Sequence, residues 1–269
     1  MTDETPEVGQ RARAERFTGR RVLVTGGSRG LGEQVVRLLL SEGAGVATCA
    51  RKPEFLETLR RSSGRADALF TRSLDVAVPG PLEQFVEEAA STLGGLDGVV
   101  ACAGGARGQG ISEATAQDWS ATWEVNVGHA ARLIATSIPH LRAAGGGSVV
   151  VVASISGWKP GPQAQYGAAK AAQIHMVSSL ARELAGDGIR VNAVSPGSML
   201  IPGKRWDRMR RDDPPAFDRF RDEFPGRELV LPEEVADVVA FLLSDQSRAV
   251  TGANIPVDRG QNAPTPDGY

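Results

Sequence analysis

The residues best suited to chemistry are Tyr166 and Lys170, which lie four positions apart, with Ser154 twelve positions before the tyrosine. Side chains four apart on a helix share a face, so the lysine ammonium can lie beside the phenol. A neighbouring cation lowers the pKa of a phenol, which starts at about 10, and the phenol can then act as an acid or base at neutral pH. The same residues would occur if Tyr166 capped a surface helix, Lys170 were a solvated charge and Ser154 ended a strand. The surrounding elements must therefore distinguish a catalytic site from these structural roles.

A glycine-rich turn near the start of the chain predicts a dinucleotide site. Residues 21–32 read RVLVTGGSRGLG, an apolar run that breaks into glycines and then opens an amphipathic helical segment. Glycines allow the backbone to approach a pyrophosphate, and the following helix N-terminus offers unpaired amides. The spacing is not GxGxxG, so the turn alone is weak evidence. The residues expected at the cofactor here are Gly26, Ser28, Arg29, Gly30, Leu31 and Gly32.

The same turn also satisfies GxSxG, the nucleophile elbow of α/β hydrolases, with Ser28 as the nucleophile. That elbow needs several strands upstream, whereas this turn follows the first predicted strand. No acid followed by a histidine occurs near the end of the chain, so hydrolysis is the weaker interpretation. The three histidines lack metal-ligand spacing, and no metal site is predicted.

Composition indicates one globular domain in a reducing compartment. The chain has 269 residues, 41% of them apolar, which is enough for one large core. A net charge of −2 argues against electrostatic binding of nucleic acid. Cys49 and Cys102 both fall in predicted buried strands and leave no disulfide framework, which favours the cytoplasm. The charged N-terminus has no apolar core for a signal peptide or a membrane span, so no membrane partner is expected.

Apolar strand-like runs alternate with helical stretches, which predicts a doubly wound α/β fold, a Rossmann-type parallel sheet of about seven strands. Runs such as VVVVAS are apolar at nearly every position, as expected for strands covered on both faces. Flexible tails are expected over 1–19 and 263–269, around a single domain over 20–262. The expected strands are 21–25, 45–50, 67–74, 97–102, 147–153, 189–194 and 254–257.

Charge at the end of the second strand favours NADP(H) over NAD(H). An acidic residue there would hydrogen-bond a ribose 2′-hydroxyl, but this chain reads CARKP, with Arg51 after Ala50. Arg51 and Arg29 are suited to a 2′-phosphate, because a guanidinium matches phosphate geometry. The alternative is that both arginines are solvated loop charges.

Taken together, these motifs resemble the short-chain dehydrogenase/reductase family from about Arg20 to about Asn262. The resemblance rests on TGGSRGLG, Asp75 after the third predicted strand, CAGG at 102–105, Asn126, Ser154, YGAAK and SPG at 195–197. The nearest general likeness is to 3-oxoacyl carrier-protein reductases and to polyketide or sugar-type ketoreductases. It implies an NADPH-dependent enzyme that transfers hydride between the cofactor and a ketone or secondary alcohol.

The resemblance also implies roles for the site residues. Tyr166 would protonate the carbonyl oxygen, with Lys170 keeping the phenol acidic and holding the nicotinamide ribose. Ser154, chosen over Ser156 because it directly ends the strand, would hydrogen-bond the substrate oxygen. Asn126 would anchor a water that relays protons to Lys170, or it could be a packing amide at a helix kink.

Further cofactor contacts follow from the same resemblance. Asp75 would contact the adenine amino group, although a cap on the turn before Pro79 is an equal alternative from the residues alone. The other expected contacts are Val76, Ala103, Gly104, Asn126, Tyr166, Pro196, Gly197 and Met199. The chain departs from the family where Ala101 and Cys102 replace asparagines and Ile201 replaces a threonine. Cys102 is interpreted as a packed small hydrophobe rather than a nucleophile.

Residues 200–228 form two charged helical pieces broken by Pro214 and Pro215, which predicts a substrate lid. Trp206 and the nearby phenylalanines could close over a hydrophobic substrate or merely pack the lid together. The resemblance implies a homo-oligomer, a tetramer or a dimer, built on helices near 117–140 and 165–185. A non-catalytic NADP-binding sensor or scaffold is the alternative function, because a fold alone does not establish turnover.

Overall fold

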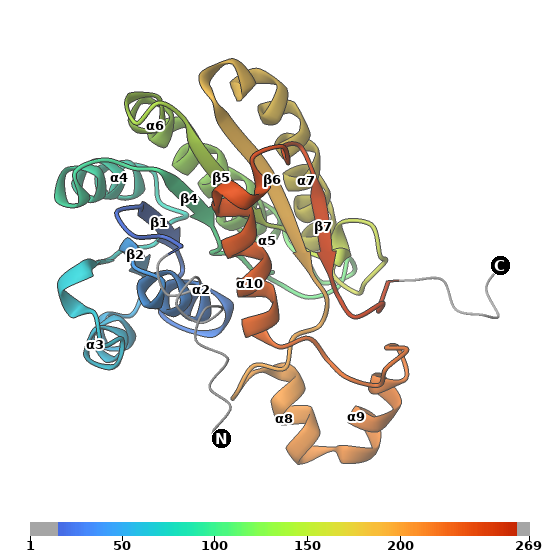
Figure 1. Ribbon diagram of the computed structural model, residues 1–269. Coiled ribbons are helices and arrows are strands. Elements are labelled where there is room, and N and C mark those ends of the chain that lie inside the picture. Colours follow the sequence, from blue (N-terminus) through green and yellow to red (C-terminus); the bar gives the residue numbers. More distant parts are fainter. Residues whose placement is uncertain (1–15, 263–269) are drawn as a thin grey trace, which may run out of the picture.

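The computed structural model describes residues 16–262 and has one seven-stranded parallel sheet in the order β3-β2-β1-β4-β5-β6-β7 (Figure 1). This topology confirms the predicted doubly wound α/β fold, and each strand lies within a few residues of its expected place. The strands are β1 (Arg21–Thr25), β2 (Gly45–Ala50), β3 (Leu69–Ser73), β4 (Gly98–Ala101), β5 (Gly147–Val152), β6 (Ile189–Pro196) and β7 (Asn254–Val257).

Helices cover both faces of the sheet, which explains why its strands are apolar at nearly every position. In β1, Leu23 packs into one core, while Val22 and Val24 pack into the other. Helices α2 (Gly30–Ser41), α3 (Pro53–Ser62) and α10 (Pro232–Leu243) contribute to the second core. The first core takes α4 (Pro81–Leu93), α6 (His129–Ala143) and α7 (Ala164–Leu184).

The connections of β1 create the place for a ligand. β1 pairs with β2 on one side and with β4 on the other, so the chain order reverses between β1 and β4. In an open parallel sheet, a crevice forms outside the carboxyl ends of the strands at such a point. The glycine turn lies there and depends on glycine, because a Cβ at Gly32 would come within 2.3 Å of the Gly26 carbonyl oxygen.

The domain begins earlier than the sequence predicts. Phe17 is only 2% exposed, and its amide donates to the Glu42 carbonyl oxygen at 2.8 Å. The Arg16 guanidinium also donates two hydrogen bonds to the Glu42 carboxylate, at 2.6 and 2.9 Å. Arg16 and Phe17 are therefore packed against the domain rather than part of a free tail. The remainder of both expected tails, 1–15 and 263–269, lies outside the described residues.

The segment predicted to be a lid contains α8 (Arg205–Asp212) and α9 (Pro214–Arg221), drawn below the sheet in Figure 1. Asp213 separates them, and its carboxylate caps α9 by accepting from the Ala216 amide at 3.1 Å. The lid aromatics pack on one another, because the Trp206 and Phe220 rings stack at 3.7 Å between centroids. Of the two alternatives for these aromatic residues, the structure favours packing within the lid.

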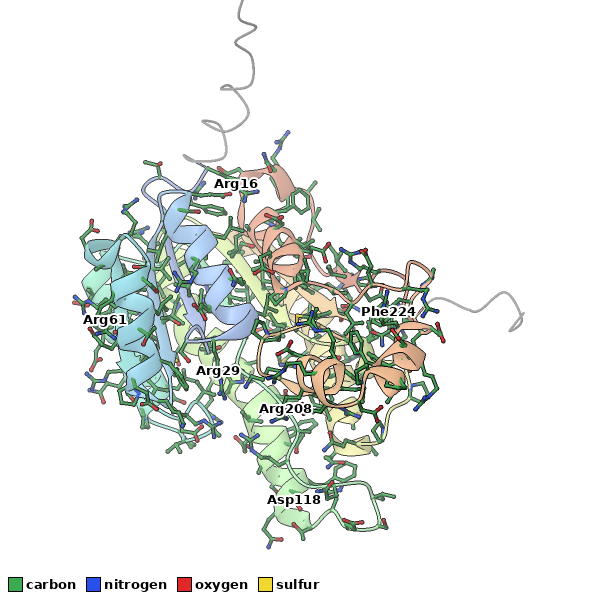
Figure 2. The ribbon with its side chains drawn as sticks, turned by 90° about the horizontal axis from the view of Figure 1, so that it is seen from below. Arg16, Arg29, Arg61, Asp118, Arg208 and Phe224 are labelled. Atoms are coloured by element: carbon green, nitrogen blue, oxygen red, sulfur yellow. The ribbon has the colours of Figure 1, made fainter. Side chains whose placement is uncertain are left out.

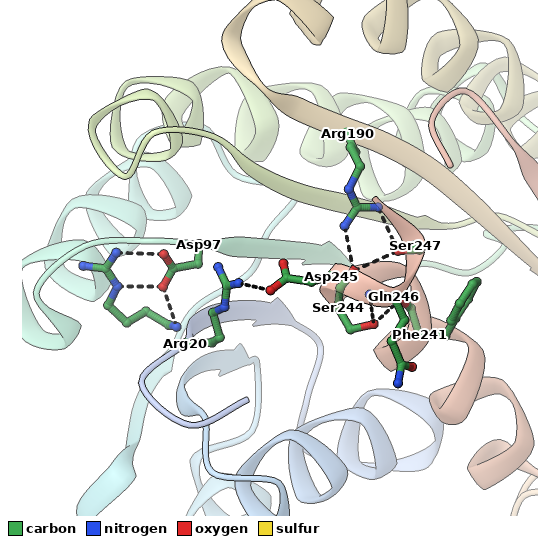
Figure 3. A network of polar contacts seen from close by, with 9 residues as sticks. Arg20, Asp97, Arg190, Phe241, Ser244, Asp245, Gln246 and Ser247 are labelled. Atoms are coloured by element: carbon green, nitrogen blue, oxygen red, sulfur yellow. Dashed lines mark hydrogen bonds and ion pairs between the residues drawn. The ribbon is translucent and has the colours of Figure 1, made fainter. Parts of the chain in front are cut away.

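The amino edge of the sheet is held by paired arginines (Figure 3). Arg21 forms a two-pronged ion pair with Asp97, at 2.7 and 2.8 Å. Arg190 donates to the Ser247 hydroxyl at 2.9 Å and to the Ser244 carbonyl oxygen at 3.1 Å. The first pair joins β1 to the residue before β4, and the Arg190 contacts join β6 to the segment after α10. None of the helices in residues 16–262 is both long and apolar enough to cross a bilayer.

Candidate functional site

A cavity of about 740 Å³ opens at the carboxyl edge of the sheet, between the glycine turn, the strand ends and α7. Its wall contains Ser154 and every predicted cofactor residue except Asn126. The predicted residues on this wall are Gly26, Ser28, Arg29, Gly30, Leu31, Gly32, Arg51, Asp75, Val76, Ala103, Gly104, Ser154, Tyr166, Lys170, Pro196, Gly197 and Met199. Segments distant in the sequence therefore converge on one site.

The turn before α2 has the form of a phosphate cradle. α2 has no side-chain cap at its N-terminus, so its first amides stay available to a ligand. At Gly26 a Cβ would lie 3.0 Å from the Ala103 Cα, which means that the turn and the β4 loop meet without side chains between them. Both features fit a dinucleotide, with its pyrophosphate at the helix N-terminus and its ribose against Ala103.

Cations gather at the end of the cavity near α3. Arg29, Arg51, Lys52 and Lys204 line it, and Asp75 is the one carboxylate among the described lining residues. Arg29, on the side of the molecule seen in Figure 2, lies over the Phe55 ring at 5.7 Å. Burial, together with Arg29 and Arg208, lowers the pKa of Lys204. Lys52 Nζ lies 3.7 Å from the Glu54 carboxylate, whereas Arg29, Arg51 and Lys204 have no acidic partner within the described residues. Three such cations on one cavity favour a ligand with several negative charges.

Asp75 forms the turn cap that is one of its two interpretations from the sequence, and it also lines the cavity. One carboxylate oxygen accepts a hydrogen bond from the Ala77 amide at 3.0 Å, and the Val78 amide donates to the Asp75 carbonyl oxygen at 3.1 Å. Asp75 therefore caps the turn after β3. The residue also lines the cavity, so the capped turn presents it to a ligand.

Tyr166, Ser154 and Lys170 meet on the wall of this cavity. Lys170 is 3% exposed, and its Nζ lies 5.5 Å from the centre of the Tyr166 ring. β5 ends at Val152, and Ser154 follows two residues later, where its hydroxyl caps the short turn Ile155–Gly157 by accepting from the Ser156 amide at 3.1 Å. Ser154, unlike Ser156, lines the cavity.

The pKa values of the pair differ from the sequence-based expectation. Burial raises the pKa of the Tyr166 phenol, although the hydrogen bond between the Tyr166 and Ser154 hydroxyls lowers it. The Lys170 ammonium instead donates to the Val152 carbonyl oxygen at 2.8 Å and to Gln173 Oε1 at 2.9 Å. Burial lowers the pKa of Lys170 to about 7. The structure thus differs from the expectation that Lys170 lowers the phenol pKa, because burial raises that pKa and the group that counteracts burial is Ser154.

Asn126 lies behind the wall rather than on it. It is 0% exposed and sits in a π turn over Glu124–Gly128. Its Nδ2 donates to the Gly105 and Thr122 carbonyl oxygens at 2.8 and 2.7 Å. Its Oδ1 would lie 2.8 Å from a Cβ at Gly104. The expected direct contact with cofactor is therefore not what the structure shows, because the backbone of Gly104 and Gly105 lies in front of the amide.

Two residues that the sequence analysis missed brace the floor of the cavity. The Thr25 hydroxyl accepts from the Cys102 and Ala103 amides at 3.1 and 3.2 Å and lies 3.2 Å from His129 Nε2. Burial lowers the pKa of His129 to about 4, so the ring stays neutral at pH 7. Thr25 and His129 therefore supply bracing that the absent asparagines could have given. Burial raises the pKa of Cys102 to about 12, in keeping with a packed thiol.

Other missed residues come from segments that no local motif marks. Lys52, Phe55, Arg107 and Lys204 also line the cavity. Lys52 directly follows Arg51 and could have been found from the same charge argument. Lys204 belongs to the lid, and only the fold brings it to the turn before α2. A hydrolase centre has no support, because no hydrogen bond joins Ser28 to a histidine within the described chain.

Comparisons with known proteins agree with this geometry. A family model described as enoyl-(acyl carrier protein) reductase matches residues 26–262. Isoepoxydon dehydrogenase patN of Penicillium expansum is 34% identical over 250 residues, which cover 90% of this chain and 94% of the relative. The 3-oxoacyl-acyl-carrier-protein reductase FabG of Thermotoga maritima is 32% identical over 247 residues, covering 91% of this chain and 98% of the relative.

Solved structures give the same result. L-sorbose reductase from Gluconobacter frateurii, complexed with NADPH and L-sorbose, has a TM-score of 0.86 at 30% identity, covering 93% of this chain and 100% of that chain. Levodione reductase has a TM-score of 0.85 at 30% identity, covering 92% and 99%. The chain belongs to the short-chain dehydrogenase/reductase family. It is thus an oxidoreductase of the class that acts on alcohol and carbonyl groups.

Proposed function

We propose that the protein is an NADPH-dependent ketoreductase that interconverts a ketone and a secondary alcohol. The observation that carries this proposal is the meeting of Tyr166, Ser154 and Lys170 on the same wall as the phosphate cradle. A proton donor and a dinucleotide site in one cavity are the two parts that carbonyl reduction needs. A cofactor-binding sensor, the alternative function, would have no use for a proton donor at this place.

The cofactor preference rests on charge. Arg29, Arg51 and Lys204 line the cavity and form no ion pair within the described residues, so their charges are available to a 2′-phosphate. The relative solved with NADPH supports the same choice. The glycine turn would hold the pyrophosphate, and Asp75 would face the adenine. When bound, the nicotinamide supplies the hydride.

The residues of this chain supply the proton and orient the carbonyl. Ser154 donates a hydrogen bond to the substrate oxygen, and Tyr166 transfers its phenolic proton to that oxygen as the alkoxide charge develops. Lys170 favours the resulting phenolate once it is charged and close to it. In the reverse oxidation, the phenolate accepts the alcohol proton. Asn126 contributes by holding the loop at Gly105 in place.

We further propose that the enzyme is a homo-oligomer that works in the cytoplasm. Trp119 and Trp123 lie four apart on α5 (Ala116–Trp123) and are 37% and 46% exposed, which supports burial against a second copy. Both cysteines are free, which supports a reducing compartment. Light scattering during size-exclusion chromatography would measure the assembly, and a monomer would contradict this part of the proposal.

The function is tested by the consumption of NADPH or NADH, followed at 340 nm, with a panel of ketones and quinones. We expect turnover with at least one ketone and a lower KM for NADPH than for NADH. Binding of NADPH without turnover across the panel would favour the sensor. A clear preference for NADH would contradict the cofactor assignment while leaving the reductase assignment intact.

A further inference from the structure

A buried glutamine connects the two residues that the sequence assigns to a proton relay. Gln173 lies on α7, less than one turn after Lys170, and is 0% exposed. Its Oε1 accepts a hydrogen bond from Lys170 Nζ at 2.9 Å, and its Nε2 donates to the Asn126 carbonyl oxygen at 2.9 Å. The Gln173 amide thus joins the Asn126 carbonyl oxygen to the Lys170 ammonium, a connection that the family resemblance assigns to a water.

The partners leave only one orientation for this amide. An ammonium can only donate, so it requires the amide oxygen, whereas a backbone carbonyl can only accept, so it requires the amide nitrogen. The π turn at Asn126 interrupts the regular helical ladder, and the Asn126 carbonyl accepts from Gln173. The amide is therefore held from both ends.

The amide also changes the energetics of the ammonium. A buried ammonium loses hydration and its charged form becomes less favourable, which is the reason that the pKa of Lys170 falls to about 7. Acceptors for its hydrogens counteract that loss. The Lys170 ammonium donates to the Val152 carbonyl oxygen and to Gln173, and the residue also lines the cavity.

We propose that Gln173 is a positioning residue of the active site, whose side-chain amide holds the Lys170 ammonium at the cavity and keeps it charged. It acts through Lys170 and does not line the cavity itself. The kinetic consequence of this inference rests on the proposed reductase function, whereas its effect on the charge of Lys170 does not.

Three titratable groups surround Lys170. Tyr166 lies 5.5 Å from Nζ on the same helix, Cys102 follows β4, and His129 begins α6. The pKa of Cys102 is raised to about 12 and that of His129 is lowered to about 4, so neither changes charge near neutral pH. A change in charge near pH 7 inside this cluster therefore belongs to Lys170, coupled to Tyr166.

The charge of Lys170 can be measured directly in the cofactor-free protein. The chain contains four lysines, Lys52, Lys159, Lys170 and Lys204, so NMR of protein labelled with ¹³Cε-lysine gives a simple spectrum. The signal that disappears in Lys170→Met identifies Lys170. We expect Gln173→Met to lower its titration midpoint by about one pH unit and Gln173→Glu to raise it by about one pH unit or more.

Shifts of the Lys170 titration midpoint in opposite directions in the Met and Glu variants would establish that Gln173 controls the charge of Lys170. A purely structural amide would not move this midpoint in two directions. Midpoints that stay at the wild-type pH in both variants would overturn the proposal. The Glu variant keeps the size and polarity of glutamine, so it decides the matter if the Met variant does not fold. Gln165→Met is the matched control, because Gln165 is also buried on α7 but donates to the Arg107 and Gln109 carbonyl oxygens.

A kinetic measurement separates the two proposals. In an active reductase, the alkaline limb of kcat/KM should move to lower pH in Gln173→Met, with about a ten-fold loss one pH unit above the wild-type limb. The Kd for NADPH, measured in parallel, shows whether cofactor binding has changed. If the wild-type chain has no turnover, the proposed function fails, and the NMR titration still decides the role of Gln173.

Discussion

Arginines at the amino edge of the sheet have hydrogen-bonding partners within the protein, whereas arginines at the carboxyl edge have no acidic partner within the described residues. At the amino edge, the Arg21 side chain is paired with Asp97 through two hydrogen bonds. Arg190 donates to the Ser247 hydroxyl and to backbone carbonyls (Figure 3). At the carboxyl edge, Arg29 and Arg51 line a cavity and have no acidic partner within the described chain. The same residue type therefore stabilises the fold at one edge and is left available at the other.

The difference teaches where stability and function reside in this molecule. A paired, half-buried guanidinium contributes through hydrogen bonds to a charged group. Cations gathered without acids repel one another, which costs free energy unless a ligand with negative charge binds. Substitutions at the amino edge should therefore affect unfolding, and substitutions at the carboxyl edge should affect binding and turnover.

The largest expected effect is at the carboxyl edge, in Tyr166→Phe. Loss of the proton donor should reduce kcat by about 10²–10⁴-fold while the Kd for NADPH and the melting temperature change little. Steady-state kinetics and cofactor fluorescence would measure both. Tyr269→Phe, the same change at the only other tyrosine, is the control. A Tyr166→Phe enzyme that keeps most of its rate would remove the tyrosine from the mechanism.

The next largest effect is expected for the two cavity arginines that have no acidic partner within the described residues. Arg29→Ala and Arg51→Ala should each raise the KM for NADPH by about ten-fold, because each loses a charge-assisted contact to phosphate, and should leave the KM for NADH nearly unchanged. Arg60→Ala, an exposed arginine on α3 that does not line the cavity, is the control. Equal losses for both cofactors would place these arginines on the shared pyrophosphate instead of the 2′-phosphate.

At the amino edge, Asp97→Asn should reduce stability without reducing turnover. The pKa of Asp97 is held below its usual range by Arg21, so the carboxylate is charged in the folded state. Its replacement should lower the free energy of unfolding by about 1.5–3 kcal/mol, measured by urea denaturation. Asp245→Asn is the comparison, because that carboxylate is 83% exposed in its pair with Arg20 and should contribute little. Loss of kcat in folded Asp97→Asn would contradict the division between the edges.

The smallest effect is the dependence of stability on pH at His129. Burial lowers its pKa from 6.5 to about 4, so below pH 6.5 the unfolded chain takes up a proton that the folded chain does not. Stability should therefore fall by about 1.5 kcal/mol between pH 6.5 and pH 5. His129→Leu should remove this slope, whatever its effect on stability at pH 7. An unchanged slope in that variant would show that His129 is not the group responsible.

Local patterns were sufficient for the order of the elements and for most of the cavity. All seven strands appear where apolar runs predict them, since a strand covered on both faces leaves a clear signal. The glycine turn, Ser154 and the Tyr166 and Lys170 pair also lie on one wall as expected. Residues in the turns and cavity walls at strand ends can be predicted from the sequence, because the carboxyl ends of parallel strands lie at the same edge of the sheet.

Burial and contacts between distant segments were not predictable in the same way. The place of Asn126 behind Gly104, and the packing of Trp206 on Phe220, depend on which neighbours cover a side chain. The bracing of the β4 loop by Thr25 and His129 joins residues more than 100 positions apart. No spacing rule within a helix or a strand contains that information.

By itself, the sequence determined the doubly wound sheet, the turn that can hold a pyrophosphate and the residues that can move a proton, because these depend on local periodicity and residue type. Only the tertiary structure decided the pKa values and the contacts of those residues. Enclosure raises the pKa of Tyr166, lowers that of Lys170 to about 7 and places Gln173 against the ammonium. The free energy of a charged group depends on its exposure to water and on its hydrogen-bonding and charged partners. Only the folded structure determines both.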